Sequence, residues 1–162
     1  MNPYGRIFQA LNEGDVRYLV VGGVAMNLLG YPRFTGDIDI LLALDKNNLK
    51  RMAQRMKHMG YEKRLPVEID ELGDEKKVLT LMKKKGLQAY TFINTAEPQC
   101  TIDVIMGASL HFEKYQKHHV TIDVWNIPIP VVSIDDLIGM KKSTNRRKDA
   151  EDVVALLELK GQ

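Results

Sequence analysis

Apolar residues recur along the chain with two spacings, one typical of helices and one typical of strands. Ile7, Phe8, Ala10 and Leu11 line one helical face before Gly14, which predicts a short amphipathic helix. A second helix is predicted after Gly22-Gly23. Further helices are predicted at 46–59, 110–117, 133–142 and 147–160. The helix at 133–142 also has a capping signature, because an acidic residue follows its Ser by three positions.

Shorter apolar or alternating runs predict strands. They lie at 17–21, 37–44, 88–94, 99–106, 120–125 and 127–132. The last two form a hairpin or two edge strands, since Pro128 and Pro130 cannot donate ladder hydrogen bonds. We therefore predict one α+β domain over 1–162, with a small mixed sheet, helices packed behind it and a helical C-terminal part at 133–162.

The segment 61–86 is dominated by charge. An acidic run over 68–75 is followed by lysines at 76–77 and 83–85, and such runs usually face water. The segment is predicted to be a mobile insertion. The alternatives are that Lys83–Lys85 contact a substrate phosphate, or that the segment forms a lid over a site.

Composition excludes several classes of protein. The chain has 162 residues, a formal net charge of +2 and one cysteine, Cys100. The near-balanced charge argues against nucleic-acid binding through net charge, and a single cysteine cannot form an internal disulfide. The longest uncharged run, 18–32, is interrupted by glycines and is too short for a membrane span. Because no signal peptide is recognisable either, we expect a cytoplasmic protein without membrane contact.

The strongest chemical signal is the pair Asp37 and Asp39. Side chains alternate along a strand, so both carboxylates lie on one face, about 7 Å apart, with Ile38 and Ile40 on the other. Two such carboxylates repel each other unless a cation or proton lies between them. The pair therefore suits Mg²⁺, although an isolated Asp-x-Asp is more often a solvated edge strand.

The residues upstream of this pair make the signal more specific. A buried strand ends at Gly22-Gly23, where a helix begins. Glycines at a helix N-terminus expose backbone N–H groups without a Cβ in the way, and such a place accepts phosphate groups. A phosphate cradle followed by paired carboxylates is far more specific than either part.

This combination resembles the signature of the DNA polymerase beta-like nucleotidyltransferase superfamily. The fuller run, Gly22-Gly23-x-Ala25 through Arg33-x-Thr35-x-Asp37-x-Asp39, is similar to a bacterial branch that includes the AbiEii-type toxins. Two later segments, Ser133–Lys141 and Arg147–Asp152, are also similar to that branch. One departure is Gly23, where many members of the superfamily carry a serine.

The resemblance implies a third carboxylate from a neighbouring strand. The tetrapeptide Thr-Ile-Asp-Val occurs twice and offers two candidates, Asp103 and Asp123. We favour Asp103 because its strand is apolar enough to be an inner one, whereas Asp123 precedes Trp125 and two prolines. The implied catalytic and metal ligands are thus Asp37, Asp39 and Asp103.

The resemblance also implies a nucleotide site formed by Gly22, Gly23, Arg33, Thr35 and Lys141. Arg33 could equally be a solvated loop cation, and Lys141 lies near a helix end where a cation is favourable anyway.

Other candidates are interpreted structurally. Asp149 and Asp152 are interpreted as helix-stabilising, with an ion pair to Lys141 or Arg147 as the alternative. His118-His119 is interpreted as surface, and the methionines of 52–59 as core.

The function implied is a metal-dependent nucleotidyltransferase, with Mg²⁺ or Mn²⁺ as cofactor. It would transfer an NMP from an NTP, ATP among them, to a hydroxyl on RNA, a protein or a small molecule. The alternative is an interaction or regulatory module of a toxin–antitoxin or phage-defence pair. Such a module would bind a partner protein encoded nearby, and NTP without turnover.

Overall fold

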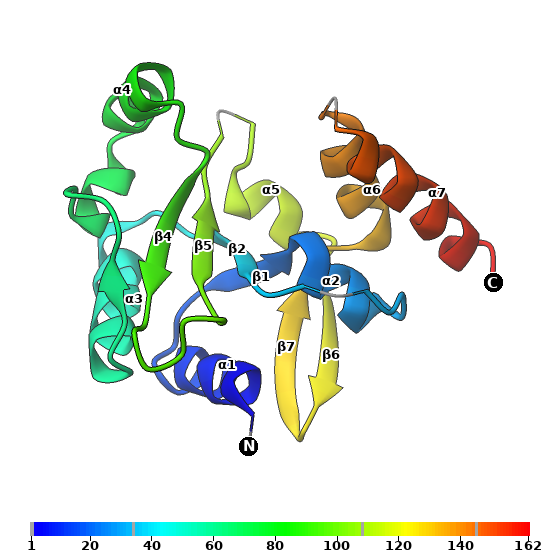
Figure 1. Ribbon diagram of the computed structural model, residues 1–162, viewed down its shortest axis with the longest axis horizontal. Helices are drawn as coiled ribbons and strands as arrows, with labels where there is room; N and C mark the ends of the chain where they lie inside the picture. The colour runs from blue at the N-terminus through cyan, green and yellow to red at the C-terminus, as the bar shows by residue number, and fades with distance from the viewer. Residues whose placement is uncertain (1, 34, 108, 145) are drawn as a thin grey trace.

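A seven-stranded mixed sheet runs through the molecule and carries helices on both faces (Figure 1). The computed structural model describes residues 2–33, 35–107, 109–144 and 146–162. The helices are α1 Pro3–Glu13, α2 Gly22–Leu29, α3 Lys46–His58, the 3₁₀ helix η1 Ile69–Gly73, α4 Glu75–Lys85, α5 Phe112–Gln116, α6 Ile134–Lys142 and α7 Arg147–Lys160. The strands are β1 Tyr18–Val21, β2 Ile38–Leu42, β3 Glu62–Lys63, β4 Ala89–Ile93, β5 Ile102–Ile105, β6 Val120–Val124 and β7 Ile127–Val131.

The strand order is β3-β4-β5-β2-β1-β7-β6, which places β2 in the middle of the sheet. Strand β2 pairs antiparallel with β1 and parallel with β5, and β1 pairs parallel with β7. The mixed α+β architecture predicted from the sequence is confirmed. Because β5 is the parallel neighbour of β2, residues far apart in the sequence meet at the centre of the sheet.

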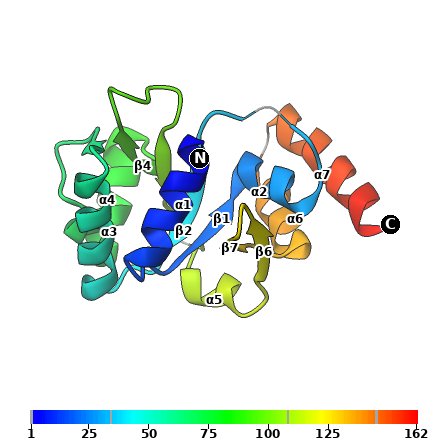
Figure 2. The same cartoon turned by 90° about the horizontal axis from the view of Figure 1, so that it is seen from below.

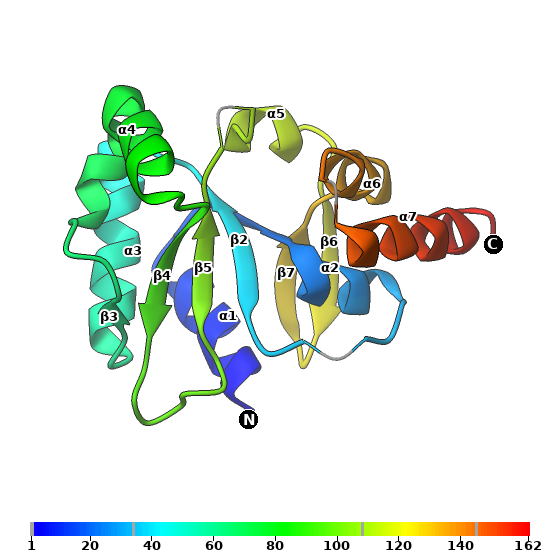
Figure 3. The same ribbon diagram turned by 45° about the horizontal axis from the view of Figure 1, so that its top comes forward.

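The core extends over both faces of the sheet: it includes buried residues of α1 and α3 on one face, and of α2, α6 and α7 on the other (Figure 3). The apolar residues of the two central strands, Ile38, Ile40, Ile102 and Val104, are at most 1% exposed. Side chains alternate along a strand, so the residues between them point to the opposite face, where α2 lies. Asp39 of β2 and Asp103 of β5 therefore lie on this second face, where both are only half-buried.

Side-chain caps define where several helices begin. Asp45 Oδ1 accepts from the N–H of Asn48 at 2.9 Å, and Ser133 Oγ accepts from the N–H of Asp136 at 3.1 Å. Ser133 is therefore the N-cap of α6, as the sequence signature predicted. Asn48 is fully buried, and its amide group bonds the backbone of Arg17 and Ala43. These bonds tie α3 to the sheet while satisfying a polar group that would be costly to bury alone.

Strands β6 and β7 form the predicted hairpin. Its two turn residues, Trp125 and Asn126, both have positive φ, 55° and 61°, as a two-residue turn matching the strand twist requires. The prediction that both strands lie at an edge was wrong for β7, which lies between β1 and β6. Its two prolines are tolerated because β1 reaches β7 only at Val131, beyond both of them.

Segment 61–86 contains β3, η1 and α4, which its charge pattern did not predict. Leu72 of η1 is 1% exposed, and the hydroxyl of Tyr61 donates to the carbonyl of Cys100 at 2.8 Å. The segment thus packs against the body of the protein, and its mobility and its role as a lid stay predictions. Across the described ranges, no helix combines the length and apolarity that crossing a membrane requires.

The C-terminal helices α6 and α7 pack against each other next to α2 (Figure 2). The close approach is visible at Gly30, which ends α2, since a Cβ there would lie 3.6 Å from a methyl group of Leu159 on α7. Helix α6 also follows directly from β7. This connection brings the end of α6 toward the turn between β1 and α2.

Candidate active site

The turn from β1 into α2 is built around two glycines. Gly22 has φ +68°, and a Cβ there would collide with the carboxylate of Asp39. A Cβ at Gly23 would lie 2.9 Å from the hydroxyl oxygen of Thr35. The carboxylate of Asp39 thus lies directly against the start of α2. The Thr35 hydroxyl lies beside Gly23, so a serine at this position would require Thr35 to shift.

Asp39 and Asp103 lie opposite each other on adjacent parallel strands. Their Cα atoms are partners in the register of β2 and β5. Asp123, in the identical tetrapeptide, lies on β6 at the outer edge of the sheet, where it pairs with Pro128. The structure thus brings Asp103 to the predicted carboxylates and leaves Asp123 remote from them.

Two threonines hold the carboxylates in place. Thr91 on β4 donates its hydroxyl to Asp103 Oδ1 at 2.6 Å. Thr101 donates to Asp37 Oδ1 at 2.5 Å, one residue before β5 begins. Thr91 lies outside the motifs recognised in the sequence, and Thr101 begins the tetrapeptide that contains Asp103 without having been assigned a role there. Only the pairing of β4 with β5 and of β5 with β2 shows that these hydroxyls face the acidic residues.

Burial and mutual repulsion disfavour the fully ionised state of the carboxylates in this site. The pKa of Asp39 is raised to about 7, first by burial and then by the charges of Asp103 and Asp37, while Lys141 and Arg146 act in the opposite direction. The pKa of Asp103 is also raised, mainly by burial. Carboxylates in this condition favour a bound cation, which offsets their repulsion.

The eight residues predicted from the sequence line one cleft of about 740 Å³. They are Gly22, Gly23, Arg33, Thr35, Asp37, Asp39, Asp103 and Lys141. Met82 of α4 contributes to one wall, and Leu137 and Met140 of α6 contribute to another. A cleft with an acidic floor, a helix N-terminus and flanking cations is suited to a phosphorylated ligand held through a metal ion.

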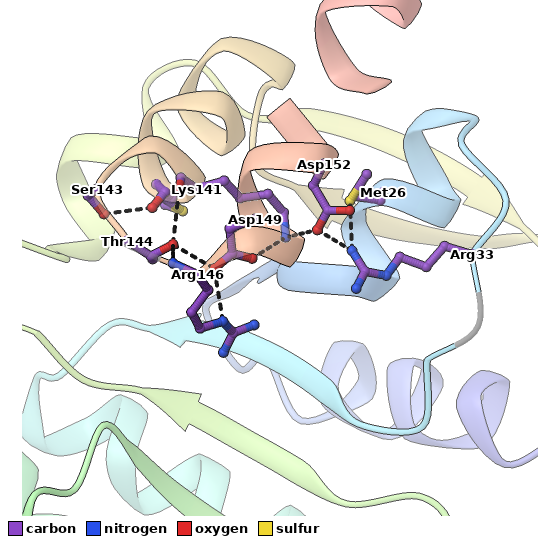
Figure 4. A network of polar contacts seen from close by, with 9 residues as sticks. Met26, Arg33, Lys141, Ser143, Thr144, Arg146, Asp149 and Asp152 are labelled. Carbon is purple, nitrogen blue, oxygen red and sulfur yellow. Dashed lines mark hydrogen bonds and ion pairs between the residues drawn. The ribbon is translucent and has the colours of Figure 1, made fainter. Parts of the chain in front are cut away.

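A buried ion-pair network holds Arg33 and Lys141, two of the cations that line this cleft (Figure 4). Lys141 Nζ lies 2.8 Å from Asp152 Oδ2 and 3.4 Å from Asp149 Oδ1. Arg33, from the loop before β2, forms an ion pair with Asp152 as well. Arg146 Nε lies 3.1 Å from Asp149 Oδ2. The network therefore joins the loop before the carboxylates to α6 and α7.

The network decides several open questions from the sequence. Asp149 and Asp152 are 4% and 7% exposed, so their role goes beyond the predicted stabilisation of the helix start. The alternative of an ion pair with Lys141 is confirmed. Arg147 instead lies 3.6 Å from Glu151, and the interpretation of Arg33 as a solvated cation was wrong.

The electrostatic state of Asp152 follows from its partners. Burial alone raises the pKa of this carboxyl, but hydrogen bonds from Lys141 and Arg33 outweigh it and hold the pKa below the usual value. Asp152 is therefore charged under ordinary conditions and compensates both cations.

The acidic residues fit a divalent cation that brings ligands of its own. Within the ranges that the structure describes, no three His, Cys, Asp or Glu side chains already surround one point closely enough to cage a metal. Mg²⁺ does not require such a cage, because it retains several waters and is commonly bound by one or two carboxylates plus substrate phosphates. The facing pair Asp39 and Asp103, with Asp37 beside it, meets that requirement.

The fold and the cleft define a nucleotidyltransferase-type protein, with a glycine turn facing paired carboxylates on a mixed sheet. Residues 6–161 match the family described as "Nucleotidyl transferase AbiEii toxin, Type IV TA system". The chain belongs to this family.

Solved structures of low sequence identity share the fold. The lincosamide antibiotic adenylyltransferase LnuA, with lincomycin bound, has a TM-score of 0.61 and 14% identity, covering 96% of this chain and 95% of LnuA. ANT(2'')-Ia, in complex with adenylyl-2''-tobramycin, has a TM-score of 0.58 and 12% identity, covering 94% of this chain and 84% of that one. An antigenic nucleotidyltransferase-like protein from Paracoccidioides brasiliensis has a TM-score of 0.55 and 15% identity, covering 96% and 73%. No curated protein sequence matches this chain.

Replacing Asp39 by Asn should stabilise the metal-free protein increasingly as the pH rises from about 4 to 7. With a folded-state pKa of about 7, the native wild type binds more protons than the unfolded chain in this window. The wild type therefore loses stability as the pH rises, by a few kcal/mol in all, and no further above about pH 7. Asn carries no charge and avoids this loss.

Urea unfolding in EDTA at several pH values measures the effect, with Asp123→Asn on the outer strand as the matched control. If the difference in stability between wild type and Asp39→Asn stays constant from pH 4 to 8, the pKa of Asp39 is not raised in the folded protein.

Proposed function

We propose that this chain is a metal-dependent nucleotidyltransferase that transfers an NMP from an NTP to a hydroxyl group. The observation that carries the proposal is the position of Asp39, opposite Asp103 on β5 and against the glycine turn that begins α2. Asp39 thus lies next to both the proposed phosphate-binding turn and a second carboxylate. Membership of the AbiEii nucleotidyltransferase family supports the same reaction class.

The start of α2 is the proposed triphosphate site. The first N–H groups of a helix have no partner within it, and they carry the positive end of the helix dipole. Val21 precedes the helix and has no polar side chain to cap them. Gly22 and Gly23 let a phosphate approach this backbone closely, with the hydroxyl of Thr35 beside Gly23.

Asp37, Asp39 and Asp103 are the proposed ligands of Mg²⁺ or Mn²⁺. When bound, the metal supplies charge neutralisation for the carboxylates and for the phosphate oxygens. Arg33 and Lys141 line the same cleft, and Asp152 fixes both of them. These two cations would orient the triphosphate and stabilise the charge that develops on it.

The proposed chemical step transfers the nucleotidyl group directly to the acceptor. The hydroxyl oxygen of the acceptor forms a bond to the α-phosphorus, the bond from that phosphorus to the β-phosphate oxygen breaks, and pyrophosphate leaves. Asp103 takes the hydroxyl proton. Positioned proton acceptors of this kind are typical general bases.

Two lines of comparison bear on the acceptor and the partner. LnuA and ANT(2'')-Ia, which share the fold, carry lincomycin and adenylylated tobramycin in their structures, which supports a small-molecule hydroxyl. The family description names a toxin of a toxin–antitoxin system, which supports an antitoxin as partner. RNA and protein are the macromolecular acceptors to be tested. We place the activity in the cytoplasm, where NTPs are available.

The experiment incubates the purified protein with each α-labelled NTP, Mg²⁺ or Mn²⁺, and fractions of host RNA, protein and small molecules. We expect label on one fraction with the wild type and none with Asp37→Ala/Asp39→Ala. If the protein shows only a metal-dependent thermal shift with NTP and no transfer, the binding module is correct and the enzyme assignment fails.

A further inference from the structure

A second, smaller cavity opens beside the catalytic cleft. It measures about 190 Å³ and lies between η1, α4 and the C-terminal ends of β2 and β5. We call it the apolar pocket, and its principal lining residues are Leu42, Leu44, Leu72, Val78, Leu79 and Val104. One water molecule needs about 10–15 Å³ of such volume. The pocket therefore has room for a much larger group.

The apolar pocket adjoins the cleft. Ile105, Met106 and Leu110 line both cavities. Ile105 follows Asp103 by two residues on β5, so the two side chains lie on the same face, about 7 Å apart along the strand. Leu42 and Val104 belong to the opposite face of the sheet, so the pocket begins where β2 and β5 end. A molecule with a hydroxyl at Asp103 would reach it past Ile105, Met106 and Leu110.

The rim of the pocket exposes apolar surface to solvent. Leu44 is 40% exposed and Leu79 is 37% exposed, and both line the pocket. Large apolar side chains grouped around a concavity are typical of a ligand site, since covering them with an apolar group removes unfavourable contact with water.

The charge of the pocket distinguishes between classes of acceptor. Among the described residues that line it, Glu75 and His111 have ionisable side chains, and Lys and Arg are absent. A nucleic-acid backbone requires basic contacts to its phosphates, so an RNA end is disfavoured here. The mostly apolar walls of the pocket suit an uncharged, apolar part of a ligand.

We infer that the apolar pocket binds the apolar part of the acceptor, so that the acceptor is a small hydroxyl compound with an apolar arm. This inference rests on the proposed function, because it assigns one partner of the same reaction. The cleft holds the nucleotide and the hydroxyl, and the pocket selects the molecule that carries the hydroxyl.

Binding of the straight-chain alcohols 1-butanol, 1-hexanol and 1-octanol tests the inference without catalysis. In methyl-resolved NMR spectra we expect saturable shifts at Leu72, Val78, Leu79 and Ile105. Affinity should rise roughly fourfold per added methylene, as burial of apolar surface predicts. The Leu79→Ser variant should weaken 1-octanol binding about tenfold. Leu157→Ser on α7, at a leucine that is 49% exposed and outside the pocket, should leave binding unchanged.

Three outcomes separate this inference from the proposed function. Shifts scattered over the surface, or equal losses in Leu79→Ser and Leu157→Ser, would overturn the pocket as an apolar site. If label in the transfer assay reaches only RNA or protein, the function stands and the inference fails. If it reaches a small molecule, Leu79→Ser should raise KM for that acceptor and leave KM for the NTP unchanged. Should Leu79→Ser fold poorly, Leu44→Ser replaces it on the opposite rim.

Discussion

Replacing Asp103 by Asn should reduce nucleotidyl transfer by about 10²–10⁴-fold, the range that removal of a general base produces. The same substitution at Asp123 should leave the rate within about twofold. The two residues occupy identical Thr-Ile-Asp-Val tetrapeptides, so local sequence is matched between the test and its control. Their difference lies only in where the sheet places them.

The physical reason is the strand pairing. Asp103 is the register partner of Asp39 and accepts a hydrogen bond from Thr91, whereas Asp123 lies on the outer strand β6. Asn removes the proton acceptor and a negative ligand at Asp103 while preserving side-chain size. Nothing comparable is lost at Asp123.

Initial rates of α-label transfer at saturating NTP and metal measure both variants, and circular dichroism checks that each is folded. Equal rates for the two variants, whether both normal or both abolished, would show that Asp103 has no special role.

Replacing Asp152 by Ala should lower the free energy of unfolding by about 3–5 kcal/mol, as expected when one member of a buried ion pair is removed. Asp152 compensates both Arg33 and Lys141, whose side chains are only 12% and 10% exposed. Without it, Arg33 loses its carboxylate and Lys141 retains only the longer contact to Asp149. Two cations are then buried beside each other with too little negative charge.

Glu151→Ala is the matched control one position earlier in α7. Glu151 pairs with Arg147 at the surface, where the two side chains are 69% and 94% exposed. Pairs of this kind contribute little, so the expected loss is within about 1 kcal/mol. Urea unfolding followed by circular dichroism compares the two variants. Similar losses would mean that the network around Asp152 is not a structural requirement.

Local sequence determined much of the candidate site. The glycine turn and the acidic strand are encoded within Gly22–Asp39, because a helix N-terminus and strand alternation are local consequences of residue order. The caps at Asp45 and Ser133 are likewise short-range hydrogen bonds. These features, and the resemblance to nucleotidyltransferases that they carry, were therefore readable from the chain.

Tertiary structure decided what depends on contacts between distant residues. Two identical tetrapeptides could not rank Asp103 above Asp123 with certainty, and the order of strands in the sheet placed only Asp103 beside Asp39. A carboxylate in the first turn of a helix looks the same whether it faces water or two buried cations, so the role of Asp152 needed the packing of α6 against α7. The apolar pocket arises where η1 and α4 meet the ends of β2 and β5. The sequence did not predict η1 and α4, because the buried residues of segment 61–86 are few and are separated by exposed, mostly charged ones.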